Sequence, residues 1–278
     1  MKKILVPTDF SDCANASENY AKFLAKISGA ELRYLHIINT PVDWSKLSKD
    51  QEHLFPEIKV NISRAKDQLK SRIKEAEELG LKASKLLIFN NTDEKIHKYA
   101  EDENIDLVVM GSHGQYGFKD HIMGTNTYSM LRRAKVPVVI IRKEIENPKL
   151  DTLVFATNFR EDTGKAFLKI ENLAEQLKVK LKILYVNIPN YFLETNDILK
   201  LGKSFLKEFS NYNYDIHIID AFSVERGILQ FLESGKFDGI AVATSGKSDL
   251  AQYFSPSVTE NLLSLVDGPV ISIKTTKK

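Results

Sequence analysis

Hydrophobic residues along the chain fall into short unbroken runs that alternate with longer amphipathic segments. In the first half of the chain, apolar runs predict β-strands at residues 3–8, 31–38, 84–90, 105–110 and 137–142. Apolar positions at helical spacing predict α-helices between them, at residues 12–27, 57–79, 93–102 and 125–134. Strands that alternate with helices favour an α/β fold, with a parallel sheet and helices on both of its faces.

The second half of the chain repeats the first half. Residues 4–10 align with residues 153–159 at an offset of 149, and residues 136–140 align with residues 268–272 at an offset of 132. A repeat of this length indicates two copies of one structural unit, each with its own strands and helices.

The change of offset locates an insertion in the first copy. It leaves 17 extra residues between about Asn39 and Ser84. We predict one domain at residues 1–145 and a second at residues 150–278, joined by a short linker that contains Pro148. The only tryptophan, Trp44, lies in the extra segment. That segment is either a lid over the site or an excursion that packs on its own helix.

Composition argues against several classes of function. Hydrophobic residues make up 43% of the chain and charged residues 27%, which is enough apolar material for a core. The formal charge of +2 gives no electrostatic reason to expect nucleic acid or an anionic membrane as partner. No apolar stretch is long enough to span a membrane, and no signal peptide is visible. The single cysteine, Cys13, excludes an intrachain disulfide, so we expect a cytoplasmic protein.

A glycine pattern directly after the apolar run at 105–110 is the strongest candidate for chemistry. Gly111 and Gly114 are followed by Gly124 and Thr125 in the pattern G-x-x-G-x9-G-[ST]. Glycines let the backbone approach an anion without a β-carbon in the way. A helix that begins at Gly124–Thr125 presents free N–H groups and a favourable dipole to phosphate. Glycines after a strand are also common turn residues, so a structural role stays open.

A polar turn follows the first predicted strand as well. It contains Asp9 and Ser11, either of which can cap the helix at 12–27. Asp9 can instead act as a carboxylate at the carboxyl end of a strand, which is the edge where open α/β sheets bind ligands. Both interpretations of Asp9 remain at this point.

These residues resemble the universal stress protein family. The resemblance rests on residues 6–11, 34–37, 111–125 and 136–140, and it extends over the chain as a tandem pair. It implies an open five-stranded parallel sheet of order 3-2-1-4-5 in each copy, and it implies ATP as a ligand, because one branch of the family binds ATP. Mg²⁺ would accompany a triphosphate, although no carboxylate cluster indicates a dedicated metal site.

The resemblance also implies a set of nucleotide contacts, all in the first copy. They are Pro7, Thr8, Asp9, Ile37, Met110, Gly111, His113, Gly114, Gly124, Thr125 and Asn126. The first three would contact adenine and ribose, and Ile37 would form an apolar wall for the base. Met110 and Gly111 would lie beside the ribose, and the remaining residues would lie towards the phosphates.

The second copy has lost several of these residues. The replacements are Asn158 for Asp9, Ala243 for Gly111 and Pro256 for Gly124, whereas Gly246 and Ser257 persist. Pro256 removes a backbone N–H, and its ring occupies space that a phosphate would need. Proline is also a favourable first residue of a helix. We therefore predict that the second copy keeps its fold and does not bind nucleotide.

The association of the two copies follows from the same resemblance. Family members associate through the fifth strand, which is at residues 137–142 and 269–274 here. Pairing these edges would remove two aggregation-prone apolar strands. We expect an internal pseudo-dimer with antiparallel contact between them, and a homodimer of whole chains stays open.

Three functions remain. The favoured one is an ATP-binding stress or regulatory protein, with ATP as an effector or a slowly hydrolysed ligand. The others are a ligand-free scaffold for stress signalling and an enzyme that transfers adenylyl or nucleotidyl groups. An enzyme needs a general base or nucleophile near the phosphates. The available groups, His113, Lys119, Asp120 and His121, have no recognisable spacing, and no P-loop lysine follows Gly124.

Overall fold

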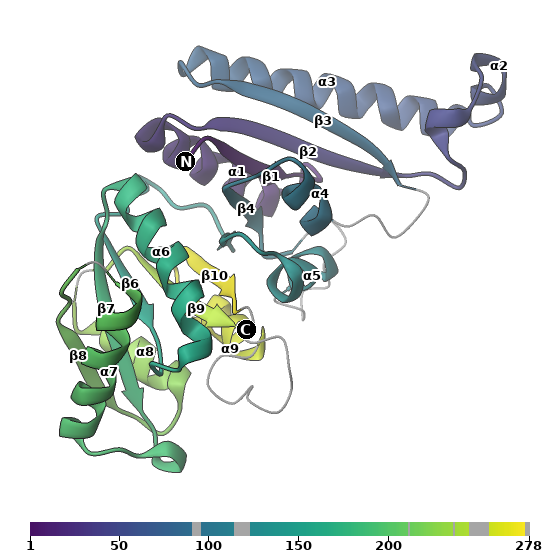
Figure 1. Cartoon of the computed structure of the whole chain (residues 1–278). Coiled ribbons are helices and arrows are strands. Elements are labelled where there is room, and N and C mark those ends of the chain that lie inside the picture. Colours follow the sequence, from purple (N-terminus) through teal and green to yellow (C-terminus); the bar gives the residue numbers. More distant parts are fainter. Residues whose placement is uncertain (91–95, 114–122, 211, 236, 245–255, 276–278) are drawn as a thin grey trace.

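A computed structural model describes residues 1–90, 96–113, 123–210, 212–235, 237–244 and 256–275 (Figure 1). The described strands form one sheet of ten, in the order β3-β2-β1-β4-β5-β10-β9-β6-β7-β8. Within each half all neighbouring strands are parallel, so each half has the predicted order 3-2-1-4-5. The two predicted sheets are therefore present, but they are joined into one.

Where residues are described, the elements of the first half confirm the sequence prediction to within two residues, and residues 93–95 of the helix predicted at 93–102 lie outside the described residues. Its strands are β1 Lys3–Pro7, β2 Glu31–Asn39, β3 Ala83–Asn90, β4 Leu107–Gly111 and β5 Val138–Ile141. Its main helices are α1 Asp12–Ser28, α3 Pro56–Glu78, α4 Ile96–Asp102 and α5 Thr125–Arg133. Two short turns, η1 Trp44–Lys46 and α2 Lys49–Glu52, precede α3.

The second half follows the same plan. Its strands are β6 Thr152–Ala156, β7 Lys180–Asn187, β8 Ile216–Asp220, β9 Gly239–Thr244 and β10 Val270–Lys274. Its helices are α6 Gly164–Leu177, α7 Thr195–Phe209, α8 Val224–Glu233 and α9 Pro256–Leu265, with short turns η2 Glu161–Thr163 and η3 Pro189–Tyr191. Within each half a helix connects each strand to the next, which is the arrangement that a parallel sheet requires.

The sheet is covered on both faces, and each face has its own hydrophobic core. Helices α1, α3, α6 and α7 pack on one face and helices α4, α5, α8 and α9 on the other. Strand residues are buried on both sides, which explains why the strands appear in the sequence as unbroken apolar runs instead of alternating ones.

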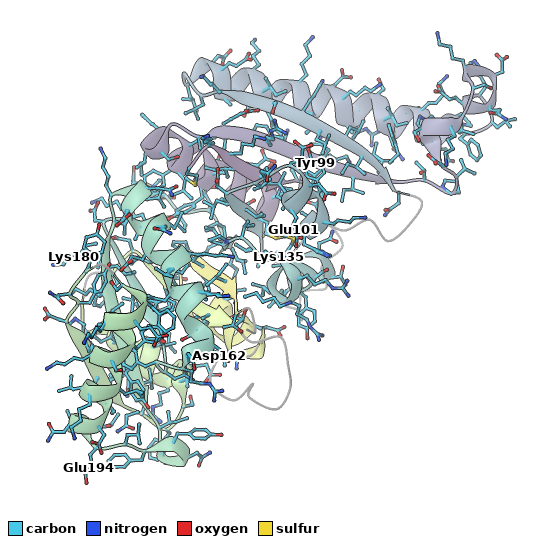
Figure 2. The ribbon with its side chains drawn as sticks, in the orientation of Figure 1. Tyr99, Glu101, Lys135, Asp162, Lys180 and Glu194 are labelled. Carbon is cyan, nitrogen blue, oxygen red and sulfur yellow. The ribbon has the colours of Figure 1, made fainter. Side chains whose placement is uncertain are left out.

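The two halves meet at their fifth strands. β5 and β10 pair antiparallel, with Val270 opposite Ile140 and Ile271 opposite Val139. Across this seam α1 contacts α6 and α5 contacts α9. Lys169 on α6 also donates a hydrogen bond of 2.5 Å from Nζ to the carbonyl oxygen of Lys135, which is labelled in Figure 2. The antiparallel contact that the sequence predicts between these strands is thus present.

The repeat also extends to individual hydrogen bonds. The Oδ2 atom of Asp106 accepts hydrogen bonds of 2.6 and 2.9 Å from the backbone N–H groups of Lys2 and Lys3. Asp238, its counterpart in the second copy, accepts two bonds of 2.8 Å from the residues at the start of β6. In both copies one carboxylate therefore fixes the beginning of the first strand beside the fourth.

The extra segment of the first copy packs on its own helix. Trp44 is buried against Ile62 and Ala65 of α3 and lies with its ring centroid 6.2 Å from that of Phe89 on β3. Figure 1 shows the adjoining α2 at the far end of α3. Of the two interpretations of this segment, the packed excursion agrees with these contacts.

Candidate functional site

The carboxyl ends of β1 and β4 lie side by side at the centre of the first half. β1 pairs with β2 on one side and with β4 on the other. The chain leaves β1 for α1 on one face of the sheet and leaves β4 for α5 on the other face. This divergence makes a topological switch point, which is where open α/β sheets place their ligands. The candidate residues from both strand ends meet there.

Asp9 forms the turn that follows β1. Its Oδ1 atom accepts hydrogen bonds from the N–H and the hydroxyl of Ser11, at 3.1 and 2.6 Å. The Ser11 hydroxyl in turn accepts a bond of 3.2 Å from the N–H of Ala14 and is the N-cap of α1. Of the two expected caps, Ser11 therefore has that role, and Asp9 is a half-buried carboxylate fixed by Ser11 at the sheet edge.

The backbone of this turn is unusual, and the second copy repeats it. Phe10 has a φ of +65° and Phe159 has a φ of +56°, although neither is glycine. In both copies the N–H of the phenylalanine donates a 3.1 Å bond to the hydroxyl of the threonine two residues earlier. Asn158 accepts a hydrogen bond from Arg160 N–H in the second copy, at 3.3 Å. The exchange of Asp9 for Asn158 therefore keeps the turn and removes a charge.

Thr8 is turned into the interior, away from the sheet edge. Its hydroxyl donates a 2.5 Å hydrogen bond to buried Glu18, and Glu18 forms an ion pair of 2.9 Å with Arg72 of α3. The Arg72 guanidinium also donates a 2.8 Å bond to Asn15 and lies over the Phe10 ring, 4.7 Å from its centroid. Glu18 and Arg72 were not predicted, although charged residues on the apolar faces of two helices are a signal that sequence analysis can find.

His36 contacts the same turn from β2. Its Nδ1 atom donates a 2.8 Å hydrogen bond to the carbonyl oxygen of Thr8, so Nδ1 carries the proton. The ring centroid lies 4.5 Å from that of Phe10. Burial holds the pKa of His36 below its usual range, which keeps the imidazole neutral. Ile37, the predicted wall for the base, is half-buried beside it and packs against the core that contains Met110.

Gly111 and Met110 both have packing roles. A β-carbon on Gly111 would lie 2.8 Å from Sγ of Cys13 and 3.0 Å from its carbonyl oxygen. Glycine at this position therefore lets the first turn of α1 approach β4 closely. Met110 is buried in the core beneath α4 and α5. The free thiol of Cys13 is buried at the same contact.

The start of α5 lies directly against the end of β4. Gly124, the N-cap of α5, donates from its N–H to the carbonyl oxygen of Ser112 at 2.7 Å. The hydroxyl of buried Thr127 donates to the carbonyl oxygen of Gly111 at 2.8 Å. Thr125 and Asn126 are exposed in the first turn, where backbone N–H groups have no partner within the helix. This helix end suits an anion, and Thr127, which was not predicted, helps to fix it in place.

The other predicted residues divide into two groups. Pro7 is half-buried at the end of β1, and His113 is half-buried with Nδ1 3.0 Å from the Ser112 hydroxyl. Gly114, Lys119, Asp120, His121 and Gly246 lie outside the described residues. The structure thus brings Pro7, Asp9, His113 and the start of α5 to one edge of the sheet.

The second copy differs from this arrangement at three further positions. The 3-10 turn η2 stands where the first turn of α1 stands, and α6 begins only at Gly164. Ala243, the counterpart of Gly111, is buried in the core that contains Phe167 of α6. Pro256 is the first residue of α9, in keeping with its value as a helix start.

Among the described residues no group of three or more His, Cys, Asp or Glu side chains could hold a metal ion. No helix in the described ranges combines the length and the hydrophobicity needed to cross a membrane.

Comparison with known proteins agrees with this arrangement. The family model described as "Universal stress protein family" matches residues 1–142. A universal stress protein of Methanocaldococcus jannaschii is 29% identical over 155 residues, covering 51% of this chain and 96% of its own length. Universal stress protein YxiE of Bacillus subtilis is 28% identical over 145 residues, covering 50% of this chain and 98% of its own. These relatives each match about half of this chain.

Solved structures also resemble the whole chain. A universal stress protein from Archaeoglobus fulgidus superposes with a TM-score of 0.70 at 22% identity, covering 99% of this chain and 97% of its own. A second, from Pseudomonas aeruginosa, superposes with a TM-score of 0.63 at 15% identity over 99% of this chain. At these identities the similarity shows that the fold is shared, including the tandem arrangement.

Proposed function

The chain belongs to the universal stress protein family, and we propose that its first copy, residues 1–145, binds ATP as an effector in a stress response. The nucleotide would lie across the carboxyl ends of β1 and β4. The second copy would bind no nucleotide, so that each chain would hold one ATP.

The start of α5 carries this proposal. Two hydrogen bonds, from Gly124 N–H and from the Thr127 hydroxyl, fix the helix end against the last residues of β4. A helix end held in this way presents its N–H groups in a fixed direction, and the exposed Thr125 adds a hydroxyl donor. Preorganised donors of this kind bind phosphate without the cost of ordering a loop.

Asp9 supports an adenine nucleotide in particular. Its carboxylate stands at the same sheet edge and is oriented by Ser11. A carboxylate accepts hydrogen bonds from the two hydroxyls of a ribose, whereas a free phosphate would be repelled by it. The combination of a carboxylate beside β1 and a helix start beside β4 therefore favours a nucleoside phosphate over an inorganic anion.

The second copy supports the expected stoichiometry. It keeps the turn after its first strand but has Asn158 in place of the carboxylate. Its helix α9 begins with Pro256, which has no N–H to offer a phosphate. We further propose that this copy serves as a permanently attached partner in an internal pseudo-dimer, joined through β5 and β10.

Mass spectrometry of small molecules released from the purified native protein tests the proposal, followed by calorimetric titration with ATP. The expected result is ATP bound at one site per chain. Two equivalent sites would contradict the assignment of the second copy. Protein that contains no nucleotide and binds none would favour a scaffold, and multiple turnover with an identified acceptor would favour an enzyme.

A further inference from the structure

The second copy contains a cavity beside its counterpart of the nucleotide site. The cavity has a volume of about 530 Å³ and lies at the carboxyl ends of β7 and β8. Asn187, Phe192, Asp220, Phe222 and Arg226 are among the residues that line it. A cavity of this size suits a single small organic ligand.

The floor of the cavity is held in one conformation. Buried Asn187 donates from Nδ2 to Oδ1 of Asp220 at 2.8 Å and to the carbonyl oxygen of Leu193 at 3.2 Å. Its Oδ1 atom accepts a 3.1 Å bond from the N–H of Leu193. This side chain therefore ties the loop after β7, which leads to Glu194 at the outer end of the second copy, to the end of β8 (Figure 2).

In the first copy the corresponding strand ends are covered by apolar side chains. By the repeat offset, Ile38 is the counterpart of Asn187, and in the sheet Ile38 lies opposite Phe89. Trp44, from the segment that the second copy lacks, packs over this pair. In the second copy the pair is Asn187 and Asp220, and the space above it is open. These strand ends are thus covered by apolar side chains in the first copy, whereas in the second copy they carry polar side chains beneath a cavity. This difference indicates a different role for this part of the second copy.

The rim of the cavity is aromatic. The side chain of Phe222 is 81% exposed and that of Phe192 is 64% exposed. Single exposed aromatic residues are common, but two that line one cavity make a local apolar surface that water solvates poorly. Flat rings of this kind bind a planar ligand by stacking.

Arg226 supplies the charge at this rim. Its guanidinium lies 5.6 Å from the centroid of the Phe222 ring. Within the described part of the chain, that guanidinium has no carboxylate partner. An arginine that stacks on an aromatic ring and forms no ion pair with a carboxylate is suited to bind a planar acid.

We propose that this corner of the second copy is a binding site for a small aromatic acid. The ring of the ligand stacks between Phe192 and Phe222, its anionic group pairs with Arg226, and an N–H or O–H on the ring donates to Asp220. The second copy thereby carries a ligand site of its own, although it has lost the residues expected for nucleotide.

The test uses two fluorescent probes with the same rings. Anilinonaphthalene sulfonate carries an aromatic system, an N–H and a permanent negative charge, and phenylnaphthylamine lacks only the charge. Both are titrated into the full chain and into three variants, Arg226→Gln, Phe222→Ser and the control Arg160→Gln. Phe222 and Arg226 are exposed side chains, so their replacement leaves the core intact.

The two probes separate charge from stacking. Arg226→Gln should weaken the sulfonate roughly tenfold, the value of one charge-assisted contact, and leave phenylnaphthylamine within about twofold. Phe222→Ser should weaken both probes, and Arg160→Gln neither. The proposal is overturned if the sulfonate probe does not bind, or if Arg226→Gln and Phe222→Ser bind it as tightly as the parent does. It is also overturned if ATP displaces the probe, or if self-association of the chain releases it.

Discussion

Gly111 at the end of β4 lies so close to Cys13 of α1 that a β-carbon would be 2.8 Å from the cysteine sulfur. The glycine pattern predicts a phosphate site from the sequence. Its first residue, Gly111, packs against helix α1. The pattern combines two requirements, the close approach of α1 at Gly111 and the helix start at Gly124. Only the second bears directly on an anion.

Gly111→Ala should therefore destabilise the fold by about 1–3 kcal/mol, the usual cost of overpacking a well-packed site. Chemical denaturation measures this loss. Adding Cys13→Ala should recover part of it, because the sulfur is removed while the carbonyl oxygen of residue 13 stays at 3.0 Å from the added carbon. A Gly111→Ala variant that is as stable as the parent but no longer binds ATP would show that the glycine serves the ligand instead.

Gly124→Val should abolish ATP binding and leave the fold intact. A branched side chain at the N-cap would stand where a phosphate approaches the free N–H groups of α5. The N-cap is half-buried, and its N–H bond to the Ser112 carbonyl does not depend on the side chain. Calorimetry with ATP and a thermal melt measure the two effects.

Pro256→Gly is the matched control for that variant. It restores the glycine in the second copy but leaves Asn158 and Ala243 in place. The stoichiometry should stay at one ATP per chain. A second site of equal affinity in this variant would mean that Pro256 alone prevents binding, contrary to the proposal.

Asp9→Asn should weaken ATP binding by roughly tenfold or more, because one charge-assisted hydrogen bond to the ribose is lost. The turn itself should survive, since Asn158 makes the same turn in the second copy. Ser11→Ala is the complementary variant, because Ser11 is the N-cap of α1. It should cost about 1 kcal/mol of stability. If Asp9→Asn binds ATP as tightly as the parent, Asp9 serves only the turn.

Most of the fold could be predicted from the sequence, and the reason is physical. Strands buried on both faces give unbroken apolar runs, and the offset of 149 pairs the same turn in both copies, as Phe10 and Phe159 show by their shared positive φ. The site was predicted less completely. Thr8 appears in the sequence as a polar residue at a strand end, but its hydroxyl is bound to Glu18 inside the protein. Which polar groups find partners in the interior depends on helix packing, and local sequence carries little information about it.

The ion pair of Glu18 with Arg72 gives a prediction about stability. Glu18 is 3% exposed, and it also accepts the hydrogen bond from Thr8. Arg72→Met keeps most of the side-chain volume but leaves this carboxylate buried without its cation, so the free energy of unfolding should fall by about 3–5 kcal/mol. Lys22→Met breaks a pair with the more exposed Glu75 and should cost less than about 1 kcal/mol. Equal losses of unfolding free energy in the two variants would contradict the conclusion that the buried ion pair of Glu18 with Arg72 stabilises the fold more than the exposed pair does.

His36 makes stability depend on pH, and the second copy supplies the variant that tests it. The neutral ring packs on Phe10, donates to the Thr8 carbonyl, and faces the charges of Asp9 and Arg72. Burial, the dominant effect, lowers the pKa of His36 from its ordinary value of 6.5. Between the pKa of the folded chain and that of the unfolded chain, the unfolded chain binds more protons. The contribution of His36 to the free energy of unfolding is therefore fully present above about pH 6.5 and is lost as the pH falls below it.

Tyr185 is the counterpart of His36 and stacks on Phe159, with ring centroids 5.6 Å apart. His36→Tyr should therefore keep a ring on Phe10 while removing the titrating group. Urea denaturation at pH 7.5 and 5.5 should show a smaller loss of stability for His36→Tyr than for the parent. His53→Gln, a change at an exposed histidine, should behave as the parent does. The same pH dependence in parent and His36→Tyr would mean that another group causes the loss, with His217 the next to test because burial lowers its pKa as well.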